Sequence, residues 1–225
     1  MKQIYHLVGT DTDIGKTYVT CKLLDHLNHL GYNANGLKPL SSGQIMVDNN
    51  YINSDSYQLM CCNQQKLPPE IINPLNFREA IAPHIAAQLH RQTLNAQLVV
   101  EQITTSLDYL HDGYVFIEGV GGVMVPLNDH ETYLEVLQQF KAPIIVVIGI
   151  KLGCLNHAQL TLKTLCELGL PLVGWIANQV DKTQEYYLEN IHYLQNKLPL
   201  PLLAQIDYGA ELQPTNEFKE IFTCN

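Results

Sequence analysis

Nine residues near the N-terminus, Gly9 to Thr17, have the composition and spacing of a phosphate-binding loop. They read Gly-Thr-Asp-Thr-Asp-Ile-Gly-Lys-Thr and lie between an apolar segment, residues 3–8, and a segment with helical spacing, residues 18–30. Such a loop directs backbone N–H groups and a helix N-terminus at one point, which suits a polyphosphate. Lys16 would neutralise the β- and γ-phosphates, and the Thr17 hydroxyl would bind Mg²⁺. The alternative is a chance glycine-rich turn, and the flanking strand and helix argue against it.

The loop departs from the common phosphate-loop pattern at its start. That pattern has a glycine at position 10, where this chain has Thr10, and its glycine comes one residue earlier at Gly9. Partitioning ATPases that are activated by a partner carry a lysine early in the loop, at the position of Asp11. The aspartate therefore favours an enzyme with a cationic or amine-bearing second substrate over a nucleotide-dependent switch.

Four polar residues come at the ends of expected strands. They are Lys38, Glu118, Lys151 and Asn178, at or after the apolar segments 34–40, 114–117, 143–150 and 172–177. The carboxyl ends of parallel strands meet at one edge of a sheet, where ligands bind. We therefore expect these side chains to lie around the phosphate-binding loop.

Oxygen ligands for Mg²⁺ are available at this edge. Mg²⁺ binds one or two carboxylates together with phosphate oxygens and waters. Thr17, Glu118 and Asp55 are the candidate ligands. The alternatives are a solvated strand end for Glu118 and a helix cap for Asp55, next to Ser54 as the expected N-cap.

The other rim residues have both functional and structural interpretations. Lys38 could hold a developing anion or be a solvated lysine, and its replacement by alanine is expected to leave the fold intact. The segment 151–158 leads into a helix whose N–H groups could bind a carboxylate. Cys154 is expected to be a packed thiol rather than a nucleophile, and His157 a hydrogen-bonding residue rather than a catalyst. Asn178 could read a nucleobase edge, and Asp181 could either do so too or cap a helix from residue 183.

The elements that must position these residues alternate between strand-like and helical segments. This order predicts one α/β domain, residues 1–225, with a mostly parallel sheet covered by helices on both faces. Segment 64–78 is expected to be irregular. One further strand is expected at 202–206. Further helices are expected at 54–61, 83–89, 98–110, 156–168 and 183–198.

Composition excludes several classes of protein. The net charge of −9 argues against nucleic-acid binding, which relies on clustered Lys and Arg. No apolar stretch approaches a membrane span, and Met1 leads directly into the first strand, so we expect a cytoplasmic protein without a membrane partner. The six cysteines lack zinc-type pairing and are expected to be free thiols.

These motifs, in this order, resemble the dethiobiotin synthetase family. The matching segments are 9–17, 38–39, 42–43, 53–55, 73–74, 83–84, 118–122, 151–158 and 174–178. The resemblance implies a P-loop NTPase-like fold and a reaction in which 7,8-diaminononanoate, CO₂ and ATP give dethiobiotin, ADP and phosphate. An amine would capture CO₂ as a carbamate, ATP would phosphorylate it, and the second amine would close the ureido ring.

The resemblance also implies roles for individual residues. Lys16, Lys38 and Thr12 would surround the carbamate and γ-phosphate, and Ser42 would contact the diamine. The family is homodimeric, so Gly153, Cys154, Leu155 and Asn156 would bind the carboxylate tail of a substrate in the neighbouring subunit. Thr17, Asp55 and Glu118 would hold Mg²⁺. Nucleotide contacts would come from Asp13, Ile14, Gly15, Lys16, Thr17, Asp55, Glu118, Gly119, Val120, Gly121, Asn178 and Gln179.

Two features limit what the resemblance implies. The family often has a proline where this chain has Asp207, so base and ribose contacts near Asp207 and Glu211 stay open, as does the nucleotide preference near Gln179. Two other activities also stay open: a nucleotide-dependent switch of the partitioning type, and an amide-forming ligase acting on a larger carboxylate.

Overall fold

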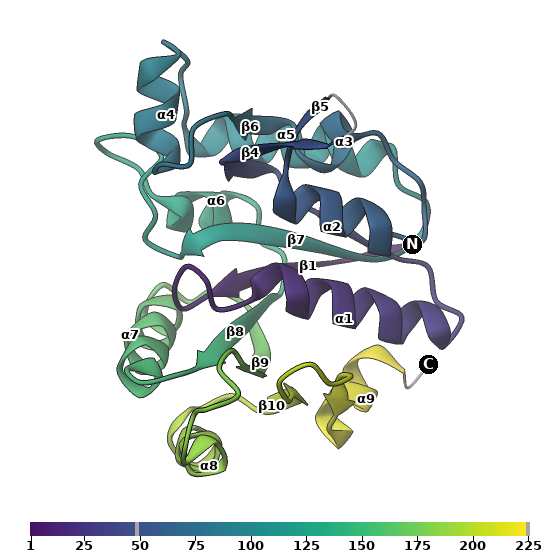
Figure 1. Cartoon of the computed structure of the whole chain (residues 1–225), viewed down its shortest axis with the longest axis vertical. Coiled ribbons are helices and arrows are strands. Elements are labelled where there is room, and N and C mark those ends of the chain that lie inside the picture. Colours follow the sequence, from purple (N-terminus) through teal and green to yellow (C-terminus); the bar gives the residue numbers. More distant parts are fainter. Residues whose placement is uncertain (48–49, 224–225) are drawn as a thin grey trace.

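The computed structural model describes residues 1–47 and 50–223, and its centre is a seven-stranded sheet (Figure 1). Every neighbouring pair is parallel except β10 and β11. The expected α/β fold is confirmed. Across the sheet the strands are β11 (Gln213–Pro214), β10 (Leu202–Ile206), β9 (Leu172–Gln179), β8 (Ile144–Ile150), β1 (Lys2–Gly9), β7 (Gly113–Gly122) and β2 (Ala34–Leu37).

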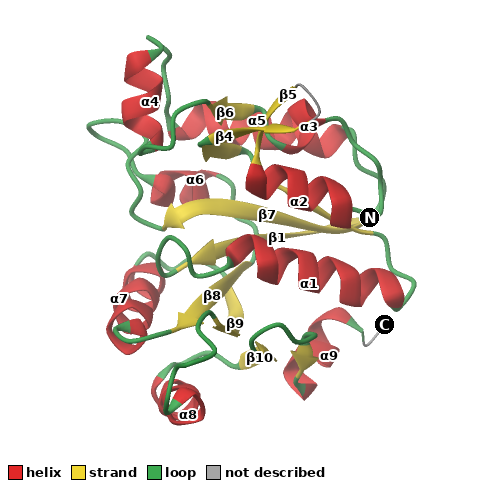
Figure 2. Ribbon diagram, in the orientation of Figure 1, coloured by secondary structure: helices red, strands yellow, loops and turns green. Residues whose placement is uncertain are grey.

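Helices cover both faces of this sheet (Figure 2). One face packs against α1 (Lys16–His29), α2 (Ser54–Cys62) and α9 (Asn216–Phe222). The other packs against α4 (Pro83–Leu89), α5 (Ala96–Asp108), α6 (Tyr133–Gln139), α7 (Cys154–Glu167) and α8 (Tyr187–Lys197).

The sequence of the central strands explains this sandwich. Successive side chains of a strand point to opposite faces, so a strand buried on both faces is apolar throughout. Leu7 of β1 belongs to the core beneath α1, whereas the next residue, Val8, belongs to the opposite core. Val146 and Val147 of β8 divide in the same way. The result is two hydrophobic cores that hold the strand ends rigidly in place.

Smaller elements lie beside the β2 side of the sheet. The strands β3 (Leu40–Ser42) and β6 (Leu75–Phe77) pair in parallel, and β4 (Gln44–Val47) and β5 (Asn50–Asn53) form an antiparallel pair. The short helix α3 (Pro69–Ile72) precedes β6. The prediction that residues 64–78 are irregular was therefore right for 64–68 and wrong for the two later segments, because Pro69 starts a helical turn and Leu75–Phe77 pairs with β3.

Several predicted boundaries also differ from the structure. The strand expected at 34–40 ends at Leu37, because the Lys38 backbone N–H donates to the Ile72 carbonyl oxygen instead of to β7, and the separate strand β3 begins at Leu40. The strand expected at 114–117 continues to Gly122 along β1, so Glu118 lies within it. The helix expected from residue 183 begins only at Tyr187.

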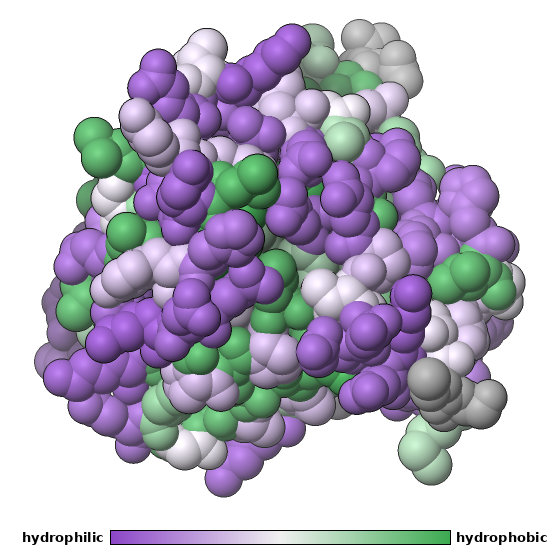
Figure 3. All heavy atoms as spheres, turned by 90° about the horizontal axis from the view of Figure 1, so that it is seen from below, coloured by the Kyte–Doolittle hydropathy of each residue, from purple (hydrophilic) through white to green (hydrophobic). Residues whose placement is uncertain are grey.

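Hydrophilic residues cover most of the rim of the face shown in Figure 3, with hydrophobic residues between them. Within residues 1–47 and 50–223, no helix has both the length and the apolar character needed to cross a membrane.

Candidate functional site

The loop between β1 and α1 is shaped by close contacts with its neighbours. Gly15 has a φ of +77°, and a Cβ there would lie 2.4 Å from Nδ2 of Asn178. Only glycine combines that left-handed conformation with so close an approach. Beneath the loop, Gly149 of β8 leaves space for Ile14, because a Cβ at 149 would lie 2.7 Å from Cβ of Ile14. Sequence and packing thus fix the loop directly against the sheet.

A lysine and two carboxylates meet beside this loop. Nζ of Lys38 lies 2.5 Å from Oε1 of Glu118 and 3.3 Å from Oδ2 of Asp55, and it donates to the Gly119 carbonyl oxygen at 3.0 Å. Lys38 is 3% exposed and Glu118 is 1% exposed, so the pair is shielded from water. The expectation that these residues gather at the sheet edge is correct, whereas the alternatives of a solvated Lys38 and a solvated Glu118 are wrong.

Two threonines of α1 complete the surroundings of Glu118. The Thr17 hydroxyl donates to Oε1 at 2.7 Å, and the Thr20 hydroxyl lies 3.1 Å from Oε2. Thr20 is fully buried and lies one helical turn after Lys16, on the same face of α1. That spacing could have indicated from sequence that Thr20 also faces the site. We call Thr17, Thr20, Lys38, Asp55 and Glu118 the inner cluster.

Burial and neighbouring charges set the protonation of the two lysines. Burial lowers the pKa of Lys38, but the adjacent Glu118 and Asp55 carboxylates outweigh it, so the net pKa is raised and the side chain stays an ammonium. Burial and the charge of Lys38 lower the pKa of Lys16 to about 8, against the attraction of Glu118, Asp55 and Asp11. The site therefore holds one firmly charged lysine and one whose charge is lost in mildly alkaline solution.

Buried amides hold the Lys38 backbone in place. The Asn73 side chain donates to the Lys38 carbonyl oxygen, and the Ser41 hydroxyl donates to Oδ1 of Asn73 at 2.7 Å. Asn53 donates to the carbonyl oxygens of Ser42 and Gly43 and accepts from the backbone of Asp55. Asn53, rather than Ser54, is therefore the N-cap of α2, because only its side-chain oxygen faces the free N–H groups.

A second group of charges lies where the loop meets α7. Oδ2 of Asp11 is 3.0 Å from Nζ of Lys151 and 3.8 Å from Nδ1 of His157. We call these three residues the outer cluster; their side chains are 34–43% exposed. Burial raises the pKa of Asp11, but the hydrogen bonds from Lys151 and the Thr12 backbone and the charge of Lys151 outweigh it, so the net pKa is lowered. The backbone carbonyl of Asp11 also accepts from Nζ of Lys16 at 2.9 Å, so this residue contacts both lysines that flank the loop.

The residues expected to bind a substrate lie on both sides of β1. Ser42 ends β3, on the β7 side, whereas Gly153 and Cys154 start α7, which follows β8. Gly153 is the N-cap of α7 with a φ of +92°, and residues 154–156 form its first turn rather than a loop before it. Asn156 is exposed, whereas Cys154 is 2% exposed, as expected for a packed thiol.

Asn178 lies beneath the loop at the end of β9. Its amide donates to the Ile14 carbonyl oxygen at 2.9 Å, so it supports the loop in addition to any contact with a base. Gln179 accepts from the Tyr208 backbone at 3.0 Å, which ties β9 to the segment after β10. Asp181 accepts from the backbone and hydroxyl of Thr183, so it closes a turn; it does not cap α8, which begins at Tyr187.

Thr12 and the glycines after Glu118 face each other. A Cβ at Gly121 would lie 3.3 Å from Oγ1 of Thr12 and 2.6 Å from a methyl group of Val125. Gly121 also has a positive φ of +54°. Thr12 and Asp13 are both exposed on the loop. This side of the loop is therefore open, and a ligand can approach its backbone from there.

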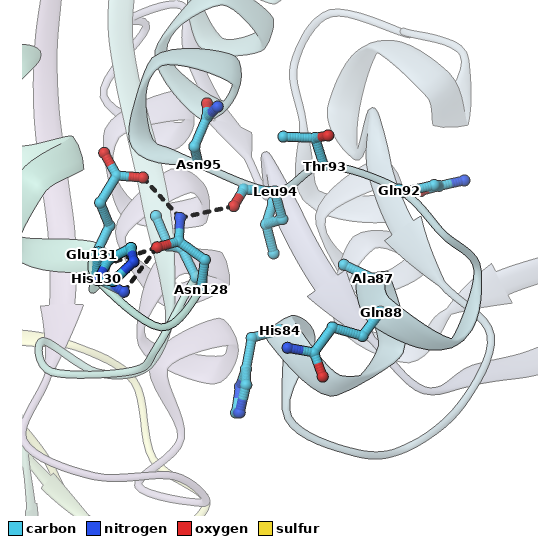
Figure 4. Close-up of a pocket in the computed structure, with 11 residues that line it drawn as sticks. His84, Ala87, Gln88, Gln92, Thr93, Leu94, Asn95, Asn128, His130 and Glu131 are labelled. Carbon is cyan, nitrogen blue, oxygen red and sulfur yellow. Dashed lines mark hydrogen bonds between the residues drawn. The ribbon is translucent and has the colours of Figure 1, made fainter.

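A pocket of about 510 Å³ lies away from these clusters, between α4 and the segment after β7 (Figure 4). Its polar groups bond to one another: the Asn128 amide donates to the Leu94 carbonyl at 2.9 Å and to Glu131 at 2.7 Å, and the Ala96 backbone donates to Glu131 at 3.3 Å. These contacts fasten the start of α5. The pocket contains none of the residues predicted to bind ligands. It is lined by His84, Ala87, Gln88, Gln92, Thr93, Leu94, Asn95, Leu127, Asn128, His130 and Glu131.

The fold and loop place the chain in a broad class. A family model described as "AAA domain" matches residues 3–216. Among solved structures, the septum site-determining protein MinD complexed with Mg-ADP from Pyrococcus horikoshii has a TM-score of 0.56 at 18% identity, over 92% of this chain and 82% of that one. Chloroplast FtsY from Physcomitrella patens gives 0.53 at 14% identity over 97% of this chain, which spans only 63% of FtsY. The chain thus has the fold of a P-loop nucleotide-binding protein.

Sequence relatives narrow this class. The ATP-dependent dethiobiotin synthetase BioD of Alteromonas mediterranea is 39% identical over 223 residues, which cover 95% of each chain. The BioD of Legionella pneumophila strain Paris is 39% identical over 208 residues, 92% of this chain and 95% of its own length. The chain therefore belongs to the ATP-dependent dethiobiotin synthetase family.

Proposed function

We propose that this protein is a cyclo-ligase that converts 7,8-diaminononanoate, CO₂ and ATP to dethiobiotin, ADP and phosphate. The observation that carries the proposal is the buried Lys38 ammonium, held between Glu118 and Asp55 next to the phosphate-binding loop. A carbamate and a γ-phosphate are both anions, and they react only if positive charge offsets their repulsion. The names of the sequence relatives support the same reaction.

The oxygen atoms around Lys38 suit Mg²⁺. One hydroxyl, from Thr17, and two carboxylates, from Glu118 and Asp55, form a hard donor set. In this structure the two carboxylates contact the cationic Nζ of Lys38, and the Thr17 hydroxyl donates to Glu118. We propose that these three residues hold the ion, with its remaining ligands supplied by phosphate oxygens and waters. When bound, Mg²⁺ supplies positive charge at the β- and γ-phosphates.

The residues of the chain would then act by binding and orientation. Backbone N–H groups of residues 13–17, and of the strand end at 119–121, would bind the phosphates of ATP. Lys16 and Lys38 would lie against the γ-phosphate and the carbamate, with Thr12 at the exposed side of the loop and Ser42 against the diamine. Their effect is to hold the carbamate oxygen in line with the phosphorus. No protein nucleophile is needed, because the second substrate amine displaces phosphate.

The two proposed groups of substrate contacts favour a homodimer. Ser42 and the segment Gly153–Asn156 lie on opposite sides of β1, and Leu152, next to that segment, is 95% exposed. We propose that the first turn of α7 binds the substrate carboxylate of a second copy, which would cover Leu152. Asn178 and Gln179 would lie beside the base, with ATP as the expected nucleotide.

The direct test is product formation. The purified chain is incubated with 7,8-diaminononanoate, bicarbonate, Mg²⁺ and ATP, and dethiobiotin is measured by mass spectrometry together with ADP. We expect equal amounts of the two products and none when the diamine is omitted. ATP hydrolysis that ignores the diamine but rises with a protein or membrane partner would instead indicate a switch. ADP formation with a larger carboxylate substrate would indicate an amide ligase.

A further inference from the structure

A groove between α1 and α2 contains three cysteines that the proposed reaction does not use. The two helices lie side by side (Figure 1). Residues at helical spacing on each helix face the other and enclose about 260 Å³. The lining consists of Tyr18, Cys21, Lys22 and Asp25 from α1, and Tyr57, Gln58, Cys61 and Cys62 from α2.

Two of these thiols lie on facing helices: Cys21 and Cys62 are both partly buried and pack against the core beneath α1 and α2, whereas Cys61 is exposed. A hydrogen bond from the Cys21 thiol is the main cause that lowers the pKa of Cys62. Burial and Asp25 oppose this shift, and Lys22 and Lys66 add to it. The same hydrogen bond, together with burial, raises the pKa of Cys21.

This arrangement differentiates the two thiols. A thiolate is the reactive form of cysteine, and nearby cations and hydrogen-bond donors favour it. Cys62 has both, and the groove leaves it partly exposed. Cys21 is held as a protonated neighbour. Redox-active pairs combine a thiolate of this kind with a second thiol that can attack it after oxidation.

We propose that Cys62 and Cys21 form a redox-reactive pair that closes into a reversible disulfide between α1 and α2. The Cys62 thiolate attacks hydrogen peroxide, the O–O bond breaks, and hydroxide leaves as water after taking up a proton, giving a sulfenic acid. The Cys21 sulfur then attacks the Cys62 sulfur, loses its proton, and expels a second water. Two thiols and one peroxide become one disulfide and two waters, and an added dithiol reverses the change.

The position of the bridge gives it a structural consequence. Helix α1 begins at Lys16 and Thr17, and α2 begins at Ser54 and Asp55, so each helix carries an oxygen ligand of the inner cluster in its first turn. A covalent bond one to two turns farther along would join these two helices. The bridge would therefore close a loop that contains both Lys38 and Asp55.

The experiment uses the full chain, reduced and freed of reductant, with hydrogen peroxide in small molar excess. Remaining thiols are blocked, the protein is digested without reduction, and peptides are identified by mass spectrometry. We expect a Cys21–Cys62 crosslinked peptide pair that disappears after dithiothreitol. The matched control is Cys61→Ala, the neighbouring exposed cysteine, which should form the same bridge at the same rate. A bridge that needs Cys61, or oxidation of other cysteines without a Cys21–Cys62 bridge, would overturn the proposal.

Two single variants separate the roles of the thiols. In Cys62→Ala the bridge should be absent and peroxide consumption should fall about tenfold or more, because the thiolate is lost. In Cys21→Ala the Cys62 sulfenic acid should persist and be trapped by dimedone, and alkylation of Cys62 at pH 7 should slow several-fold. Unchanged alkylation of Cys62 in Cys21→Ala would show that Cys21 does not activate it. Near-normal ATP binding in each variant establishes that the fold is retained.

Discussion

The inner and outer clusters lie at the same edge of the sheet and contain similar groups, but they differ in their contact with water. In the inner cluster Lys38 and Glu118 are almost fully buried, whereas the side chains of Asp11 and Lys151 in the outer cluster are more than a third exposed. The two partners of a buried pair depend strongly on each other, because removing one leaves the other charge buried and unpaired, which lowers stability. An exposed pair is screened by solvent and contributes little. Burial, rather than the residue types, therefore distinguishes the site that can stabilise reacting anions.

The largest expected effect comes from removing the buried ammonium. Lys38→Met should lower turnover about 10³-fold, because positive charge at the reacting oxygens is lost. It should also lower the free energy of unfolding by about 3 kcal/mol, because Glu118 is left without its cation. The sequence-based expectation that loss of Lys38 leaves the fold intact rested on a strand-end lysine contributing little to the core, whereas Lys38 is buried. Turnover is measured with saturating substrates, and stability by urea unfolding.

A double variant separates these two effects. In Lys38→Met with Glu118→Gln, both charges are gone, so stability should return to within about 1 kcal/mol of the unmodified chain while turnover stays low. Stability that stays low in the double variant would contradict the view that a stranded charge causes the loss. Turnover near normal in Lys38→Met would remove Lys38 from the mechanism.

His6 extends the comparison between buried and exposed charges, because among the described residues it has no carboxylate partner. Burial lowers the pKa of His6 in β1 to about 4, because the ring is fully enclosed; within residues 1–47 and 50–223 its hydrogen bond is to the Phe140 carbonyl oxygen at 2.9 Å, and Nδ1 has no partner. The unfolded chain therefore binds a proton below about pH 6.5, where the folded chain does not. The contribution of His6 to the free energy of unfolding should be fully present above about pH 6.5, and the free energy of unfolding should fall by about 2 kcal/mol between pH 7 and pH 5. Urea unfolding measures this loss.

The control is a histidine outside the core. His6→Asn, which cannot titrate, should lose most of this pH dependence, whereas His111→Asn, at an exposed position, should keep it. Equal pH dependence in all three proteins would show that carboxylates, rather than His6, determine the acid response.

The protonation of Lys16 tests the electrostatic effect of the inner cluster on its neighbour in the loop. Its pKa is lowered to about 8, first by burial and then by Lys38, so the empty site loses this charge as the pH rises above 8. Nucleotide binding then has to return the proton, and the Kd for ATP should rise up to about tenfold per pH unit above pH 8. Calorimetry between pH 7 and pH 9.5 measures the slope. Lys16→Gln should bind ATP weakly with little slope, and a flat profile in the unmodified chain would contradict the lowered pKa.

The smallest effect is expected in the outer cluster. Lys151→Met should change the free energy of unfolding by less than about 1 kcal/mol, and the change should shrink as salt is added. Asp11→Asn serves as the reciprocal variant. A loss of several kcal/mol in either would mean that the outer cluster behaves like a buried pair, and the contrast between the two clusters would fail.

The sequence predicted the strands better than the elements between them. Continuous apolar runs such as Ile144–Ile150 are typical of buried parallel strands, and the predicted strand at 202–206 matches β10. The helix α6 was missed, although Thr132 and Glu135 form a capping box. The strand β7 extends through glycines because it pairs with β1, a contact that no local pattern reveals.

The site was predicted to a similar degree. The expected strand ends placed Lys38 and Glu118 together correctly, although β7 continues past Glu118, because the carboxyl ends of a parallel sheet converge. Thr20 was missed, and Asn73 was matched to the family without a role, since a polar residue looks solvent-exposed until its buried partner is known. The contact of Asp11 with Lys151 joins residues 140 positions apart, and no local pattern reports on such a distance.

The close contact of Gly149 with Ile14 has a consequence for sequence variation. A methyl group at position 149 would overlap the Ile14 side chain. The side chains at positions 14 and 149 therefore compete for the same space. A library randomised at both positions should yield functional pairs in which any enlargement at one is matched by a reduction at the other. The nucleotide loop and the strand beneath it would then change together during evolution, and neither could drift alone.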